Sequence, residues 1–130
     1  MKLGYNLMYV DNVEATMDFY EKAFRLQKGF LHPEKCYGEM LTGETKLGFV
    51  SHEIAGSHGF QYKKQSRDSE IPAFEIGFIT ENVEESFEVA IENGAVQVKR
   101  PHEMPWGQVI SYVKDINGFL IEICSEVESS

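Results

Sequence analysis

Glu122 is the residue that first suggests chemistry, because it is a carboxylate within an apolar, β-branched segment. Ile121 and Ile123 flank it on either side. An ionised carboxylate is too costly to bury without a partner. It must therefore face solvent, a polar partner, a metal ion or a polar pocket, and its immediate neighbours leave all four open.

The strand that carries Glu122 is the second arm of a predicted β-hairpin. Strands are expected at Gln108–Lys114 and Phe119–Cys124, with Asp115-Ile116-Asn117-Gly118 between them. Asn-Gly between two apolar runs is typical of a tight hairpin turn, because both residues tolerate positive φ.

Length and charge restrict the class of protein. The chain has 130 residues, which suits one domain with a single substantial core, and its hydrophobic content of 42% is ordinary for a globular protein. A net charge of −9 argues against nucleic acid as a partner. We expect a cytoplasmic protein without a membrane segment, because no apolar run approaches the ~20 residues that a spanning helix needs.

Cys36 and Cys124 belong to no CxxC pair and are expected to be reduced thiols.

The chain reads as two copies of a β-α-β-β-β pattern. Module one is about 1–52, and module two is about 73–125. Between them lies a linker, about 53–72, in which the periodicity is lost. The C-terminal Ser125–Ser130 is expected to be a frayed tail. The expected elements are strand Leu3–Val10, helix Val13–Phe24, strands Gly29–His32, Lys35–Leu41 and Lys46–His52, then strand Ala73–Thr80, helix Val83–Asn93, strand Ala95–Lys99 and the hairpin above.

Matching letters support an internal duplication. Asn12-Val13-Glu14 recurs as Asn82-Val83-Glu84, 70 residues further along, at the same point of the repeated pattern. Each asparagine is a good N-cap for the helix that follows it. The same offset pairs Tyr5 with Glu75.

Two such modules in one chain resemble the vicinal oxygen chelate superfamily, which includes glyoxalase I, bleomycin-resistance proteins, fosfomycin-resistance enzymes and extradiol dioxygenases. The resemblance rests on three segments: Val10–Tyr20, Pro105-Trp106-Gly107-Gln108, and Tyr112–Glu122, where Ile116 replaces the usual proline. It implies an α+β fold in which two β-α-β-β-β modules form an open half-barrel cleft. It also implies a homodimer.

The resemblance assigns four metal-ligand positions, which fall on Tyr5, Gly48, Glu75 and Glu122. Only Glu75 and Glu122 are good ligands for a divalent ion such as Ni, Zn, Mn or Fe. The site is therefore incomplete, and whether a metal binds stays open. The two glutamates are the candidate catalytic residues, as a general base or as a pair that shares a proton. The alternative without catalysis is that the Tyr5 hydroxyl and Gln108 only form hydrogen bonds with the two carboxylates.

The remaining candidates would bind a small-molecule ligand in the cleft. Strand alternation places Tyr9 on the face of Tyr5, and Gln108 and Tyr112 on the face of Glu122. Trp106 is expected either to stack on a ligand at the cleft mouth or to seal the core edge. The histidines lie outside the matched positions, and His52 is expected at the surface, at the end of a strand.

Two functions follow from these observations. The first is a glyoxalase-like lyase or isomerase that acts on a small carbonyl or vicinal-oxygen substrate in an aromatic, acidic cleft. The second is a metal-free protein of the bleomycin-resistance type that sequesters a cationic antibiotic, which the net charge of −9 would attract.

Overall fold

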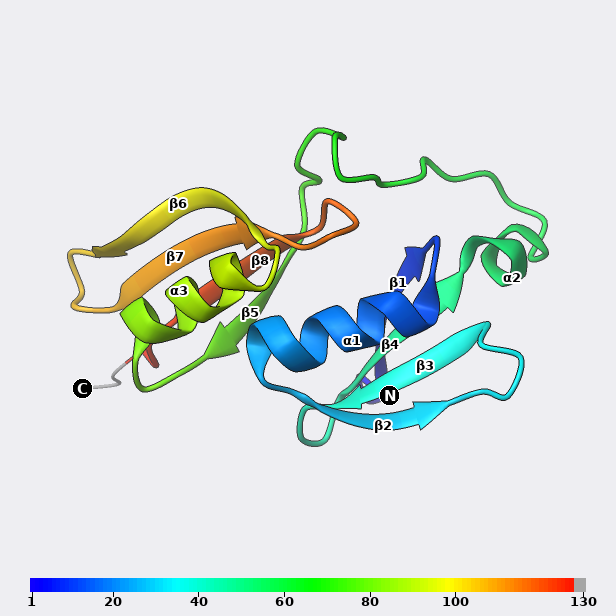
Figure 1. Cartoon of the computed structure of the whole chain (residues 1–130), viewed down its shortest axis with the longest axis horizontal. Helices are drawn as coiled ribbons and strands as arrows, with labels where there is room; N and C mark the ends of the chain where they lie inside the picture. Colours follow the sequence, from blue (N-terminus) through cyan, green and yellow to red (C-terminus); the bar gives the residue numbers. More distant parts are fainter. Residues whose placement is uncertain (128–130) are drawn as a thin grey trace. The chain divides into compact units, whose positions relative to one another are not determined.

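The computed structural model describes residues 1–127 and divides into two units, each with the order strand, helix, strand, strand, strand. The first unit, Met1–Gln65, contains β1 (Tyr5–Val10), α1 (Val13–Phe24), β2 (Gln27–Leu31), β3 (Tyr37–Leu41), β4 (Lys46–Ser51) and α2 (His52–Gly56). The second unit starts at Ser66 and contains β5 (Glu75–Ile79), α3 (Val83–Glu92), β6 (Val96–Glu103), β7 (Val109–Lys114) and β8 (Leu120–Cys124). The predicted α+β fold of two β-α-β-β-β modules is confirmed (Figure 1).

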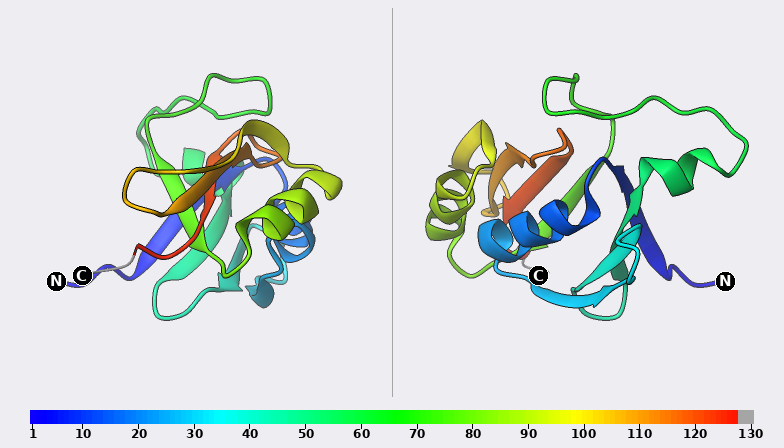
Figure 2. Two further views of the ribbon diagram at one scale, coloured as in Figure 1. Left: turned by 90° about the vertical axis from the view of Figure 1, so that its left-hand side faces the viewer. Right: turned by 45° about the vertical axis from the view of Figure 1, so that its right-hand side comes forward.

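The two sheets have the same topology. The strand order is β1-β4-β3-β2 in the first unit and β5-β8-β7-β6 in the second. The first strand of each unit pairs in parallel with the last strand, and the other pairs are antiparallel. One helix covers one face of each sheet, α3 in the second unit (Figure 1) and α1 in the first (Figure 2). In the described part of the second unit, α3 is the one helix, and it leaves the opposite face of that sheet without a helix.

Both helices start where the sequence predicts. The Asn12 side chain accepts a hydrogen bond from Ala15 N at 2.9 Å, and Asn82 accepts one from Glu85 N at 3.1 Å. Each cap satisfies a backbone N–H that the first helical turn would otherwise leave open. Gly94 follows α3 with a φ of 106°, a left-handed conformation that glycine adopts without strain. No described helix is long and apolar enough to cross a membrane.

A small residue under each helix lets it approach its sheet. Gly38 in β3 pairs with Phe49 of β4, and Ser111 in β7 occupies the corresponding place opposite Ile123 of β8. A Cβ at Gly38 would collide with the sulfur of Met17 and would lie 3.1 Å from Val13 Cγ1. The close contact between α1 and β3 therefore depends on a residue without a side chain.

One sequence prediction of local structure was wrong. The segment after β4 was expected to be a linker without periodicity, yet α2 forms at once because Ser51 Oγ caps it by accepting from Ile54 N.

The predicted hairpin is confirmed, since β7 and β8 pair antiparallel. In its turn only Gly118 adopts positive φ, at 88°. The buried Asp115 carboxylate also shapes this turn, and it accepts hydrogen bonds from Asn117 N and Phe119 N, both at 2.9 Å.

The end of the second unit is more ordered than expected up to the last described residues. Ser125 was assigned to a frayed tail, yet its backbone N–H donates to Val109 O at 2.9 Å. Residues 128–130, also assigned to that tail, lie outside the described part of the chain.

Substituting Gly38→Ala should cost about 1–3 kcal/mol of unfolding free energy, because the added methyl group overpacks the buried contact with Met17. Gly4→Ala is the control, since a Cβ there meets nothing within 4 Å and Gly4 lies outside the helices and strands. Chemical denaturation of both variants checks this prediction, and an equal stability for the two would contradict it.

Candidate functional site

Glu75 and Glu122 lie on the helix-free face of the second sheet. The parallel pairing of β5 with β8 places Gly77 directly opposite Glu122, and Glu75 lies two residues before Gly77 on the same side of β5. A Cβ at Gly77 would lie 3.8 Å from Glu122 Oε1, so the Glu122 carboxyl group extends over bare backbone. The structure therefore brings the two predicted glutamates together on one surface.

The environment of Glu122 changes its acidity. Partial burial, then hydrogen bonding and charge repulsion from Glu75, raise the pKa of Glu122 to about 7. A hydrogen bond with Cys124 opposes this rise. Because the two carboxyl groups interact, they form a pair that holds a proton near neutral pH.

Tyr112 and Cys124 complete this cluster. Tyr112 is the antiparallel partner of Glu122 across the β7–β8 hairpin. Burial, followed by the charges of Glu122 and Glu75, raises the pKa of the Tyr112 phenol. Burial and the charge of Glu122 likewise raise the pKa of the Cys124 thiol. Both groups thus keep their protons at neutral pH, and the site offers a base beside two weak acids.

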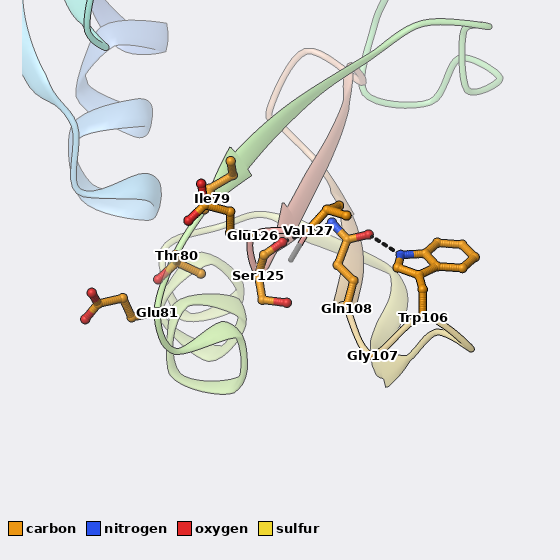
Figure 3. Close-up of a pocket in the computed structure, with 9 residues that line it drawn as sticks. All are labelled: Ile79, Thr80, Glu81, Trp106, Gly107, Gln108, Ser125, Glu126 and Val127. Atoms are coloured by element: carbon orange, nitrogen blue, oxygen red, sulfur yellow. Dashed lines mark hydrogen bonds between the residues drawn. The ribbon is translucent and has the colours of Figure 1, made fainter. Parts of the chain in front are cut away.

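Trp106 and Gln108 lie at one end of this unit, beside a hollow of about 870 Å³. The Trp106 indole N–H donates to Gln108 Oε1 at 2.9 Å, and Gln108 Nε2 donates to Ser125 O at 3.0 Å. Figure 3 shows Trp106 on one side of the hollow and Ile79, Thr80 and Glu81 on the other. Gln108 thus fixes the indole ring, which is 59% exposed.

The first unit carries different residues at the equivalent places. Leu7 of β1 pairs with Gly48 of β4, as Gly77 pairs with Glu122 in the second unit. A Cβ at Gly48 would lie 2.7 Å from Leu7 Cδ2 and 3.0 Å from the Tyr37 hydroxyl oxygen. Neighbouring side chains therefore fill the space that a residue such as Glu122 would need.

Sequence analysis missed Glu39, the acidic residue on this face of the first unit. Its carboxylate accepts a hydrogen bond from the Tyr37 hydroxyl at 2.6 Å and lies 3.5 Å from Lys46 Nζ. Burial and this hydrogen bond raise the pKa of Tyr37. Lys46 also lies over the ring of Tyr5, 5.8 Å from its centre. The alternation that placed Tyr112 opposite Glu122 would have placed Glu39 opposite Gly48.

Tyr9 belongs to an aromatic cluster in the first unit. Its ring packs edge-on against Tyr62, with 4.9 Å between the ring centres, and Tyr62 stacks on His52. His52 Nδ1 lies 2.7 Å from the Tyr62 hydroxyl oxygen, and only 9% of the His52 side chain is exposed. The prediction of a surface histidine was wrong, because the segment after α2 folds back and covers it.

The residues do not fit a metal centre of the family's four-ligand type. Of the four positions, the second unit supplies the carboxylates Glu75 and Glu122, while the first supplies the phenol of Tyr5 and, at Gly48, no side chain. The ends of the Leu7 and Tyr37 side chains occupy the space beside Gly48. Zinc and similar ions usually take three or more protein ligands, often with nitrogen or sulfur donors.

Comparison with known proteins agrees with this architecture. Residues 3–128 match the glyoxalase-like domain family, and the chain belongs to that family. It is 26% identical over 124 residues to the uncharacterized protein YraH of Bacillus subtilis (strain 168), which covers 95% of this chain and 97% of that protein.

Solved structures show the same fold. A glyoxalase-related enzyme from Fulvimarina pelagi is similar with a TM-score of 0.83 and 15% identity, over 97% of this chain and 88% of that one. A glyoxalase/bleomycin resistance protein/dioxygenase family enzyme from Burkholderia phytofirmans PsJN is similar with a TM-score of 0.75 and 20% identity, over 98% and 100%. The predicted membership of the vicinal oxygen chelate superfamily is confirmed.

The raised pKa of Glu122 should make stability depend on pH. The folded protein holds this proton up to about pH 7, whereas the unfolded chain releases it near the ordinary value of 4.5. Between these values the unfolded state binds fewer protons, so stability should fall as pH rises. Glu122→Gln should remove this part of the dependence, as measured by urea unfolding from pH 4 to 8.

The exposed Glu103, at the end of β6, provides the control. Glu103→Gln should keep the pH dependence of the wild-type protein. Identical pH profiles for Glu122→Gln and the wild type would show that Glu122 titrates normally.

Proposed function

We propose that this protein is a lyase or isomerase that removes a proton from carbon next to a carbonyl in a small, vicinally oxygenated substrate. The observation that carries this proposal is the cluster of Glu75, Glu122 and Tyr112 on one face of the second sheet. The proposal concerns the class of reaction and gives each of these three residues a role in it.

Glu122 is the general base. A base is most effective when its pKa lies near the working pH, because it is then substantially ionised and still accepts a proton strongly. The pKa of about 7 for Glu122 meets this condition. Its carboxylate takes the carbon-bound proton, and the electron pair moves onto the carbonyl oxygen to give an enolate.

Tyr112 stabilises the enolate. Its phenol stays protonated, because burial and the neighbouring carboxylates raise its pKa, and it donates a hydrogen bond to the enolate oxygen. Return of the proton from Glu122 to the former carbonyl carbon, with transfer of the α-hydroxyl proton to the enolate oxygen, completes an isomerisation. Loss of a leaving group from the β-carbon instead re-forms the carbonyl group, leaves a double bond between the α- and β-carbons, and completes a lyase reaction. Glu75 raises the basicity of Glu122 in either case.

Deuterium exchange tests this chemistry without knowledge of the natural substrate. Hydroxyacetone in D₂O should lose the proton NMR signal of its carbon-bound hydrogens next to the carbonyl faster with the protein than without it. The rate should rise with pH and level off above about pH 7, because the ionised form of Glu122 is the base. Glu122→Gln should lower the rate by about 100-fold or more.

Two further variants sharpen the test. Tyr112→Phe should slow exchange while preserving the pH profile, because it removes the hydrogen-bond donor and leaves the base. Glu103→Gln should exchange at the wild-type rate. Exchange that is equally fast in Glu122→Gln would assign the base to another group.

The hollow beside Trp106 favours a second candidate, the binding of a cationic aromatic molecule such as bleomycin. The fixed, exposed indole offers a stacking surface, and Glu81 and Glu126 line the same hollow. Cations are attracted to the face of an indole ring and to carboxylates. Sequestration of this kind needs neither a metal nor a catalytic base.

Calorimetry with bleomycin tests sequestration. Binding should give measurable heat at micromolar concentrations, and Trp106→Ala should weaken it by about tenfold, in line with the loss of a cation–π contact. Phe74→Ala is the matched control, since Phe74 is a similarly exposed aromatic residue in the same unit. An absence of heat, or equal losses in both variants, would count against this function.

A further inference from the structure

The turn between β2 and β3 brings together three side chains that the site above does not use. His32, Glu34 and Cys36 alternate along this turn, and each offers a donor atom within 4.8 Å of the other two. His32 and Cys36 are half-buried and Glu34 is exposed. Imidazole, carboxylate and thiolate are the three donor types that zinc takes from proteins.

The backbone of this turn is held at both ends. Lys35 N donates to His32 O at 2.7 Å, and His32 N donates to Tyr37 O at 2.9 Å. Pro33 fixes φ at the second position of the turn. Ser51 N of β4 donates to Cys36 O at 2.9 Å, which anchors the turn to the sheet. These hydrogen bonds hold the backbone that carries the three donors.

The spacing of the donors suits a tetrahedral ion. Cys36 Sγ lies 3.7 Å from His32 Nδ1. Zinc–sulfur and zinc–nitrogen bonds of about 2.3 and 2.1 Å at a tetrahedral angle would separate the two atoms by roughly 3.6 Å. The thiol and the imidazole therefore already lie at the distance that a shared zinc ion requires.

The groups around the turn are compatible with the binding of a metal cation by the three donors. Lys35 directs its ammonium group to Glu14 of α1, 3.3 Å away, so it is engaged outside the donor set. The Nδ1 atom of His32 accepts a hydrogen bond from Glu34 N at 3.1 Å, which requires an unprotonated nitrogen with a lone pair. That lone pair is the one a metal ion would use.

We propose that His32, Glu34 and Cys36 form a binding site for a zinc-class divalent cation. On binding, the Cys36 thiol releases its proton to solvent, and the Nδ1 lone pair of His32 turns from the Glu34 N–H to the metal. Three protein ligands leave a fourth position for water or for a donor from another molecule. None of its three residues belongs to the unit that carries Glu75 and Glu122.

Cobalt titration tests the site, because a cobalt–thiolate bond absorbs in the near ultraviolet and tetrahedral cobalt absorbs strongly in the visible. The reduced Cys124→Ser variant is the starting protein, since it removes the other cysteine. It should develop both absorptions in proportion to one bound ion, and added zinc should abolish them. Zinc should also raise its thermal midpoint.

Further substitutions in this background assign the ligands. Cys36→Ser should abolish the near-ultraviolet absorption, and His32→Ala should abolish tetrahedral binding. Glu34→Gln alters an exposed side chain, so it should fold normally and weaken cobalt binding by about tenfold or more, since even outer-shell changes cost this much. His102→Ala, which changes a histidine of the other unit, should bind as the parent does.

Two results would overturn the proposal. One is the absence of cobalt–thiolate absorption in Cys124→Ser at a large excess of cobalt. The other is absorption that keeps its strength and affinity in His32→Ala, which would indicate a lone thiolate adduct and not a built site.

Discussion

Parallel pairing of the first and last strands in each unit is the constraint on which the candidate site depends. A parallel pair cannot be joined by a tight turn, and in each unit a helix and two further strands lie between its members. This connection separates Glu75 from Glu122 in sequence, while the register of β5 and β8 places them on one face of the sheet. The same helix covers the opposite face, which leaves the glutamates on the uncovered side.

Much of this arrangement could be predicted from the sequence, because the duplication shows both in the repeated Asn-Val-Glu tripeptide and in the repeated β-α-β-β-β order. Asn12 and Asn82 are capping residues whose role is local, and both cap as predicted. The proximity of Glu75 and Glu122 also follows from alternation once the strands are paired. Local sequence signals and the repeated order of elements were sufficient to predict these features.

Other features depend on contacts that a linear pattern does not contain. The burial of His52 requires Tyr62 to return from beyond α2, and the hairpin turn depends on the buried carboxylate of Asp115. The pKa of Glu122 depends on its burial and on Glu75. Glu39, in contrast, could have been predicted from the sequence, because alternation across the β3–β4 hairpin gives its position. It was missed because only the four metal-ligand positions of the resemblance were considered.

The two units differ in how they balance an acidic group on the uncovered sheet face. In the first, Lys46 is the parallel partner of Tyr5 and supplies a cation 3.5 Å from Glu39. In the second, the corresponding partner of Glu75 is Leu120, an apolar residue that supplies no charge to Glu122. Burial and the charge of Glu75 therefore act on Glu122 without a cation from that position, and its pKa rises. The same strand position thus holds a lysine beside the single carboxylate of Glu39 in the first unit and a leucine beside the two carboxylates of the second.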